Sequence, residues 1–353
     1  MTPTVPKKDE AMHDPDDAAL EMTERLLRER CTDAVLFRAD AGEWCGDLWD
    51  ALDSFGLPLA MVSEKSGGLG MTPAEALRIA ALAGRAALPL PMPETMLSNW
   101  LLDLSGLAHA EGPAVIVPQG LSLVPEGGDW RLLGTAPKVP WGRSATVVAV
   151  TGGQVVRAGR TGALLRQAAN IANEPRDTLR FDQPVPADAV APLPAGVDPF
   201  TLLAALRCAQ MAGAMEQITD LTTDYALQRH QFGKPLAKFQ AVQQSLAVLI
   251  EHAAAGQVAA GMACEAVASL PMRSLAVAAG KVRIGEAAGN VAGIAHQVHG
   301  AIGFSHEYRL HHLTRRLWSW REEYGNETHW ARKLGAALAA AGPDGLWPAI
   351  TAI

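Results

Sequence analysis

The sequence predicts an α+β fold in which two helical regions flank a small antiparallel β-domain. In the first and last thirds of the chain, apolar residues recur at spacings of three and four, the period of an amphipathic helix. The middle third carries short runs rich in Val, Leu and Ile, separated by Gly, Pro and Asp, which is typical of strands joined by turns. We find no internal repeat and no heptad pattern, so neither a solenoid nor a coiled coil is expected.

The N-terminal region is predicted to be a flexible tail over 1–17 followed by a helical domain over 18–110. The tail is polar and contains Pro, Lys and Asp, whereas apolar residues such as Leu48 and Leu52 then recur at helical spacing. The run Thr72-Pro-Ala-Glu75 predicts a helix start, with Thr as the N-cap, Pro in the first turn and Glu three residues later.

The middle region, 112–195, is predicted to be a reduced β-domain, either a barrel or a sandwich. Its roughly 80 residues are a plausible size for one small domain. The β-type runs are Val115–Val117, Leu121–Val124, Trp130–Leu133, Thr146–Val150 and Leu179–Phe181.

The C-terminal region, 198–342, is predicted to be an antiparallel four-helix bundle, with a tail over 343–353. Asp198-Pro199 begins a long helix that ends near Arg229, and three further helical patterns follow with short links. The expected centres of these three helices are 239–250, 274–296 and 307–323.

Composition excludes several classes of protein. The 353 residues are 49% hydrophobic and 19% charged, which suits a folded protein of two or three domains. The formal net charge of -7 argues against a nucleic-acid partner, because general nucleic-acid binders carry a basic excess. No apolar run reaches the roughly 18 residues that a membrane span needs. The four cysteines are widely spaced, and the N-terminus lacks the pattern of a secretion signal, so a cytoplasmic location is expected.

Two loops of the predicted bundle carry residues suited to a phosphate-bearing ligand. In Arg229-His-Gln-Phe-Gly-Lys-Pro-Leu236, an Arg at a helix end can pair with a phosphate, and Phe232 can stack on a heterocycle. In Gln297-Val-His-Gly-Ala-Ile-Gly-Phe304, two Gly three apart allow backbone N–H groups to approach phosphate oxygens. Taken singly, each loop is better explained as an ordinary helix–helix turn.

In combination, the two loops and the predicted β-domain resemble the acyl-CoA dehydrogenase family over about residues 18 to 340. In that family each FAD lies across a dimer interface, with its flavin ring against the β-domain of one subunit and its ADP half on the bundle loops of the other. Here Ala301 replaces the second Gly that the family usually has. The resemblance implies ADP-side FAD contacts for Arg229, Gln231, Phe232, Phe239, Gln297, Gly300 and Gly303.

The resemblance fails where the family carries its catalytic base. Family enzymes remove the α-proton of the substrate with a Glu, because the base must be ionised and within hydrogen-bond reach. Counting from Gln297 places Tyr324 at the usual base position, and matching Tyr to Tyr places Gly325 there. The other known base position, on the preceding long helix, holds Leu203. We therefore expect no catalytic residue in this chain.

A displaced base remains the alternative. Glu323 and Glu327 are the carboxylates close enough in sequence to swing into the base position. The flavin-binding motifs of the β-domain are also unrecognisable, and Trp141 stands near their expected place, where it is equally compatible with a strand-end core residue.

This selective loss resembles the non-catalytic subunit of heteromeric bacterial acyl-CoA dehydrogenases. The resemblance implies an α2β2 assembly with a catalytic partner subunit, shared FAD and an electron-transfer flavoprotein as electron acceptor. The complex would remove the α-proton of an acyl-CoA, pass the β-hydride to the flavin and release a 2-enoyl-CoA. Such assemblies are associated with bulky substrates, notably steroid side-chain CoA esters. A self-sufficient homodimer with a displaced base and a non-enzymatic scaffold of the same fold are the two alternatives.

We expect no metal site. Several histidines follow residue 296, but a metal ion needs several ligands aimed at one point. The bundle lacks paired Glu-x-x-His motifs, and the adjacent Glu251 and His252 point in different directions.

Overall fold

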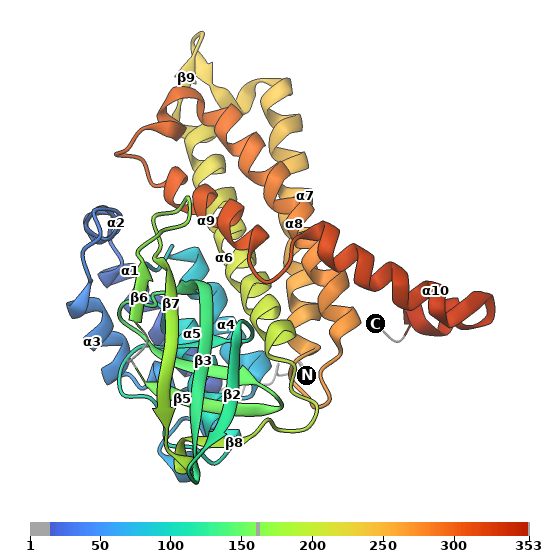
Figure 1. Ribbon diagram of the computed structural model, residues 1–353. Coiled ribbons are helices and arrows are strands. Elements are labelled where there is room, and N and C mark those ends of the chain that lie inside the picture. Colours follow the sequence, from blue (N-terminus) through green and yellow to red (C-terminus); the bar gives the residue numbers. More distant parts are fainter. Residues whose placement is uncertain (1–14, 160–162, 352–353) are drawn as a thin grey trace, which may run out of the picture.

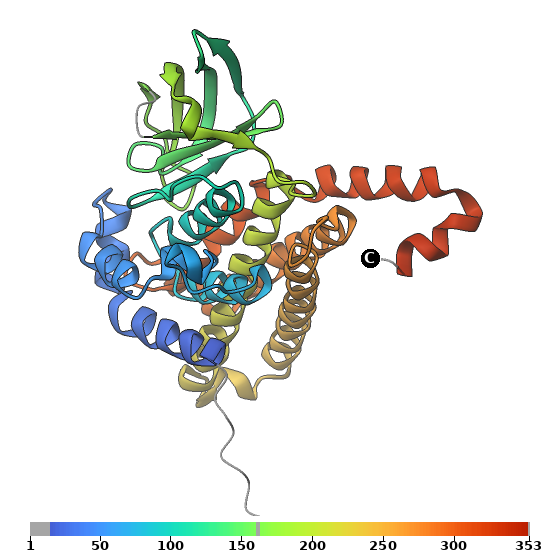
Figure 2. The ribbon, with the colours of Figure 1, turned by 90° about the horizontal axis from the view of Figure 1, so that it is seen from below.

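The first helices of the chain form one side of a helical body beside two small sheets (Figures 1 and 2). The computed structural model describes residues 15–159 and 163–351, and it confirms the predicted α+β class. Of the predicted tail, 1–17, residues 1–14 lie outside the described residues, and a helix begins at Pro15. The N-terminal helices are α1 (Pro15–Arg30), α2 (Asp33–Asp40), α3 (Gly46–Ser54), α4 (Pro73–Arg85) and α5 (Met92–Leu104).

Helix α4 begins as the sequence predicted and then packs closely on the long bundle helix α6 (Pro199–Gln228). The Glu75 carboxylate accepts a hydrogen bond from the Thr72 backbone N–H at 2.8 Å, and the Thr72 hydroxyl accepts one from the Glu75 N–H at 3.4 Å. Where the two helices cross, a Cβ on Gly213 would lie 1.8 Å from the Ala81 carbonyl oxygen. This contact between backbones requires Gly at that position, and it fixes α6 against the N-terminal helices.

The middle of the chain forms two four-stranded sheets. Their orders are β1-β4-β5-β8 and β2-β3-β7-β6. The predicted antiparallel arrangement is wrong for one pair, because β1 lies parallel to β4. The strands are β1 (Ala114–Val117), β2 (Leu121–Glu126), β3 (Asp129–Pro140), β4 (Thr146–Thr151), β5 (Gln154–Gly159), β6 (Ala163–Arg166), β7 (Arg176–Val185) and β8 (Val190–Pro192).

The first sheet is buried on both faces, which explains its nearly continuous apolar strands. Successive side chains of a strand point to opposite faces. Accordingly Ile116 and Val148 belong to the core shared with the helices, whereas Val115 and Val147 belong to a second core with the other sheet. A strand covered on both sides loses the alternation of apolar and polar residues.

The C-terminal region forms the predicted bundle. The Asp198 carboxylate accepts a hydrogen bond from the Phe200 N–H at 3.1 Å and so caps α6. The first half of α6 is buried on all sides, which suits its largely apolar sequence. The remaining bundle helices are α7 (Gln240–Glu265), α8 (Ser274–His299) and α9 (Leu310–Glu322).

The last helix, α10 (Glu327–Thr351), projects away from the bundle (Figure 2). It departs from the sequence prediction, since 343–351, expected to be a tail, is helical after a break at Gly342. Short 3-10 helices occur at η1 (Leu57–Leu59), η2 (Glu64–Ser66), η3 (Ala187–Ala189), η4 (Leu236–Lys238) and η5 (Gly300–Phe304).

Helix α7 is long and apolar enough to pass a composition test for a membrane span. The same test is passed by core helices of folded proteins. Helix α7 packs against both α6 and α8 in the bundle, and this contact buries one face of it, including Leu249, Ala253 and Ala260. Val248, Ile250 and Val258 lie on its exposed face.

Candidate functional site

The first predicted nucleotide loop is a short hairpin at the far end of the bundle from the sheets (Figure 1). Strands β9 (His230–Gln231) and β10 (Lys234–Pro235) pair antiparallel directly after α6 ends. At the tip, Phe232 has a φ of 51° and is 91% exposed. Positive φ is uncommon for a bulky residue. The Phe232 ring meets the Phe239 ring edge-on, with centroids 6.2 Å apart, and is otherwise open to solvent. The hairpin therefore presents an aromatic ring to whatever lies outside the bundle.

In the second predicted loop, the backbone conformation requires glycine at one position and close packing requires it at the other. Gly300 ends α8 with φ 63° and ψ −141°, a conformation that is essentially restricted to Gly. Gly303 is packed tightly, since a Cβ there would lie 3.0 Å from the His299 Cβ and 3.1 Å from Nδ1 of His296. The loop thus turns sharply and lies close against the end of α8.

The two loops lie at the same end of the bundle and are joined through one aromatic contact. The rings of Tyr225 and His299 stack with centroids 4.4 Å apart, near the ends of α6 and α8 respectively. Around this contact, Arg229, Gln231, Phe232, Gln297 and Gly300 are exposed. Their assignment to FAD, together with that of Phe239 and Gly303, stays a prediction.

The segment at the predicted base position forms a tight turn after α9. Tyr324 and Gly325 have φ values of 54° and 90°, and the Tyr324 carbonyl oxygen accepts a hydrogen bond from Trp330 Nε1 at 2.9 Å. The Arg207 guanidinium lies over the Tyr324 ring, 5.5 Å from its centroid. Burial raises the pKa of the Tyr324 hydroxyl to about 12, so this side chain stays protonated at neutral pH. At the other base position, Leu203 is buried in the core.

Glu323, one of the two alternative bases, is held between two buried arginines. Its carboxylate accepts hydrogen bonds from Arg176 Nε at 2.7 Å and from Arg207 Nε at 2.8 Å. The side chains of Arg176 and Arg207 are 5% and 0% exposed. Burial by itself would raise the pKa of Glu323, but the charges of the two arginines outweigh burial and bring its pKa down to about 2.

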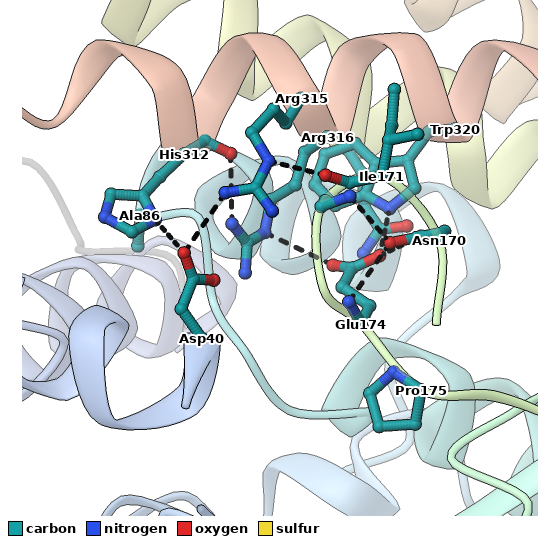
Figure 3. A network of polar contacts seen from close by, with 12 residues as sticks. Asp40, Ala86, Asn170, Ile171, Glu174, Pro175, His312, Arg315, Arg316 and Trp320 are labelled. Carbon is teal, nitrogen blue, oxygen red and sulfur yellow. Dashed lines mark hydrogen bonds and ion pairs between the residues drawn. The ribbon is translucent and has the colours of Figure 1, made fainter. Parts of the chain in front are cut away.

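These ion pairs extend into a network that crosses from the β-domain to the helices. On the helical side, Arg207 also pairs with Glu94 of α5 at 2.8 Å. On the β-domain side, Arg176 pairs with Glu174 at 2.9 Å. Figure 3 shows Glu174 reached from α9, where Arg316 lies 3.2 Å away and Trp320 donates through Nε1 at 3.2 Å. The two parts of the molecule are therefore tied together by buried charges beside the predicted base position.

Glu327, the second alternative base, is also paired. Its carboxylate accepts a hydrogen bond from Arg321 Nε at 2.5 Å. The side chain lies directly on α8, because a Cβ on Gly285 would be 2.0 Å from the Glu327 Oε1. Glu327 is thus fixed against a helix.

Sequence reasoning did not find Arg207, Glu94, Arg176 or Glu174. Arg207 is the one charged residue in the buried stretch 199–215 of α6, and Glu94 is the one charged residue in the buried stretch 92–102 of α5; a buried charge requires a partner. An isolated charge in an apolar stretch was therefore the sequence feature that could have predicted a buried ion pair. Trp141 is 4% exposed, with the Arg176 guanidinium 5.1 Å from the centroid of its ring, which supports its interpretation as a core residue.

Comparison with known proteins explains this combination of features. The family model described as "Acyl-CoA dehydrogenase, C-terminal domain" matches residues 198–329. Acyl-CoA dehydrogenase IpdE2 of Mycobacterium tuberculosis is 30% identical over 267 residues, which cover 75% of this chain and 78% of that protein. The chain belongs to the acyl-CoA dehydrogenase family. Acyl-CoA dehydrogenase FadE34 of the same organism is 29% identical over 310 residues, which are 82% of this chain and 42% of that protein.

Solved structures show that the acyl-CoA dehydrogenase fold extends over nearly the whole chain. The structure titled "Tcur3481-Tcur3483 steroid ACAD G363A variant" has a TM-score of 0.81 and 23% identity, covering 92% of this chain and 98% of that chain. The ChsE4-ChsE5 complex from Mycobacterium tuberculosis has a TM-score of 0.80 and 21% identity, covering 94% and 99%. The family resemblance stated from the sequence is confirmed. Acyl-CoA dehydrogenases are oxidoreductases that bind FAD, and their substrates are acyl-CoA thioesters.

Proposed function

We propose that this acyl-CoA dehydrogenase chain is a subunit of a heteromeric enzyme, contributing the ADP-side contacts of a shared FAD while a partner subunit supplies the catalytic Glu. The observation that carries the proposal is the state of Glu323. This carboxylate, which directly precedes Tyr324 in the sequence, is bound by Arg176 and Arg207, both buried, at 2.7 and 2.8 Å.

A carboxylate held in this way is a poor general base. A base accepts a proton efficiently when its pKa lies near the working pH, and the pKa of Glu323 is about 2. Protonating Glu323 would also remove one of the two carboxylates that each buried guanidinium pairs with, leaving only Glu94 for Arg207 and Glu174 for Arg176. Glu327 is engaged by Arg321, and Tyr324 stays protonated. These contacts argue against the displaced-base alternative.

The end of the bundle, in contrast, fits a nucleotide. Arg229 is exposed and has no ion-pair partner in the part of the chain that the structure describes. An Arg in that state is free to bind a phosphate. Phe232 offers an open ring face for stacking, and at the exposed Gly300, which has no side chain, a ligand can approach the backbone closely. FAD, when bound, supplies the acceptor for the substrate hydride, and we assign these residues to holding its ADP half.

For the substrate, we infer an acyl-CoA with a bulky acyl group, of the steroid side-chain type. Two of the similar solved structures support this inference. One is titled a steroid ACAD, and the other is titled a complex of ChsE4 and ChsE5. A partner that holds the flavin ring and the base would leave room at the interface for such a group. An electron-transfer flavoprotein is the proposed electron acceptor.

The test compares the chain alone with the chain co-expressed with an intact member of the family. We expect the isolated chain to carry little FAD and no dehydrogenase activity, and the complex to carry flavin and turn over an acyl-CoA. Arg229→Ala should lower the FAD content of the complex, whereas Arg25→Ala, at an exposed position on α1, should not. Stoichiometric flavin with turnover by the isolated chain would overturn the proposal. Unchanged FAD content in Arg229→Ala would favour a scaffold.

A further inference from the structure

Three metal-ligating side chains converge where α2 ends and α9 begins. Asp40 is the last residue of α2, and His311 and His312 lie in the first turn of α9. One ligand atom from each of the three lies within 4.8 Å of the others. The rings of the two histidines are 4.0 Å apart, although adjacent residues of a helix ordinarily diverge.

His311 has the hydrogen bonding that is typical of a metal ligand. Its Nδ1 lies 2.7 Å from the Tyr308 carbonyl oxygen. A carbonyl oxygen only accepts, so Nδ1 carries the proton and Nε2 keeps its lone pair. Nε2 is buried and has no hydrogen-bond partner within residues 15–159 and 163–351. Metal-bound histidines commonly donate their other ring N–H to a backbone carbonyl in this way.

His312 supplies an independent observation. It is 1% exposed, and neither of its ring nitrogens has a hydrogen-bond partner among the described residues. Buried polar groups nearly always have partners, so an orphaned ring of this kind indicates a ligand. Its Nδ1 lies 3.5 Å from Asp40 Oδ2, too far for a good hydrogen bond. Two ligand atoms that share one zinc ion in a tetrahedral site lie roughly 3.4 Å apart.

The neighbouring charges decide which metal suits the site. Arg315 Nη1 lies 3.2 Å from Asp40 Oδ2, as Figure 3 shows, and therefore offsets the single carboxylate of the site. Two further arginines have acceptors of their own, Arg316 in Glu174 and Arg309 in Asp33. Calcium and magnesium need several carboxylate or carbonyl oxygens, which this site does not offer. Two imidazoles and one carboxylate instead favour zinc among the common ions.

We propose that Asp40, His311 and His312 bind one zinc ion, which ties α2 to the first turn of α9. This departs from the expectation of no metal site, which rested on sequence spacing alone. The site is distinct from the proposed nucleotide loops, and its occupancy does not depend on a partner subunit or on flavin.

The experiment is a zinc titration of the untagged full-length chain in competition with a chromophoric chelator. We expect one equivalent to bind, and both His311→Gln and Asp40→Asn to weaken binding by at least about tenfold. His306→Gln is the matched control. His306 is exposed and its ring lies near that of His311, but it is not one of the three proposed ligands. The control should bind zinc as the parent chain does.

Cobalt substitution gives a second readout, since a tetrahedral site with these ligands produces visible d–d absorption. Absence of zinc binding by the folded parent chain would overturn the proposal. Equal binding by the parent chain and His311→Gln would overturn it too, because exposed histidines would then account for the affinity. If Asp40→Asn does not fold, His311→Gln alone decides, with circular dichroism confirming that it is folded.

Discussion

The Tyr225 hydroxyl donates a hydrogen bond to the His299 carbonyl oxygen at 3.3 Å, and the two rings stack 4.4 Å apart. His299 in turn lies 3.0 Å, through Nε2, from the Tyr308 hydroxyl. Because Arg229 follows one turn after Tyr225 and Gly300 follows directly after His299, this contact sets the spacing of the two proposed nucleotide loops. The orientation of both loops therefore depends on an aromatic pair inside the bundle.

Variants of Tyr225 should impair cofactor binding when they remove the aromatic ring and not when they keep it. Tyr225→Ala removes the stack and should lower the free energy of unfolding by about 1–3 kcal/mol. It should also reduce the FAD content of the co-expressed complex. Tyr225→Phe keeps the stack and loses a long hydrogen bond, so it should stay close to the parent chain in both measurements. Equal FAD loss in the two variants would contradict a positioning role for the ring.

Phe232 should matter for binding and not for stability. Since its side chain is 91% exposed, Phe232→Ala should change the free energy of unfolding by less than about 0.5 kcal/mol. The same variant should lower the flavin content of the complex, measured by absorbance after gel filtration. Trp347→Ala is the control, because Trp347 is also exposed, at 72%, but lies on α10. Retention of full flavin by Phe232→Ala would remove this residue from the proposed site.

The sequence was sufficient to predict those features that arise from local geometry. The capping residues Thr72 and Glu75 act within one helical turn, so their spacing alone predicts the helix start. Gly300 was singled out for close backbone approach, and its φ and ψ show why Gly is required there. The apolar runs likewise predicted β1, β2, β3, β4 and β7, but not the short strands β5, β6 and β8. The pairing of the strands was less predictable, because the parallel β1–β4 contact joins segments that the pattern cannot align.

The buried ion network could not be predicted, because its partners are far apart in the sequence. Glu323 contacts Arg176 of the β-domain and Arg207 of α6, and neither pairing leaves a spacing that a pattern can detect. From the sequence, Glu323 was a candidate base because it is a carboxylate beside the right position. Its electrostatic state is set entirely by tertiary neighbours. The same holds for Asp40 and His312, which belong to elements at opposite ends of the chain.

Glu323→Gln separates a structural carboxylate from a catalytic one. Removing the charge leaves Arg176 and Arg207 buried without it, so the free energy of unfolding should fall by about 3 kcal/mol. Turnover per folded complex should nevertheless persist, because the proposal gives the base to the partner subunit. Denaturant unfolding and a steady-state assay with an artificial electron acceptor measure the two effects.

Glu327→Gln is the companion variant. The Arg321–Glu327 pair is more exposed, with side-chain exposures of 36% and 17%, so the loss of stability should stay within about 1 kcal/mol. Abolished turnover in either variant, with the complex still folded and loaded with flavin, would identify that carboxylate as the base and refute the heteromeric assignment.

The stability supplied by Glu323 should depend on pH below about 5. Its folded pKa is about 2, against an ordinary value of 4.5, so the unfolded chain takes up a proton first as the pH falls. Stability from this group is therefore complete above pH 4.5 and is lost as the pH falls towards 2. The advantage of the parent chain over Glu323→Gln should shrink by about 3 kcal/mol across this window. Urea unfolding at a series of pH values measures the difference, and a constant advantage down to pH 3 would show that the arginines do not hold the carboxylate.

Lys281 should also make the stability of the chain rise with pH, in this case at the alkaline end. Its ammonium is 1% exposed and donates to the Trp320 and Arg321 carbonyl oxygens at 3.1 and 2.8 Å, which caps the end of α9 just before Glu323. Burial lowers its pKa from 10.5 to about 8. Between these values the folded chain has released the proton while the unfolded chain still holds it, so stability from this group rises with pH.

The comparison is between the parent chain and Lys281→Met, which keeps much of the volume and loses both hydrogen bonds. From pH 7.5 to 10.5 the parent chain should gain about 3 kcal/mol relative to the variant. Unfolding in urea at each pH gives this difference directly, and titrations of exposed lysines cancel because both proteins share them. A difference that stays flat or falls with pH would show that Lys281 keeps its proton in the folded state and that the end of α9 is capped by a permanent charge.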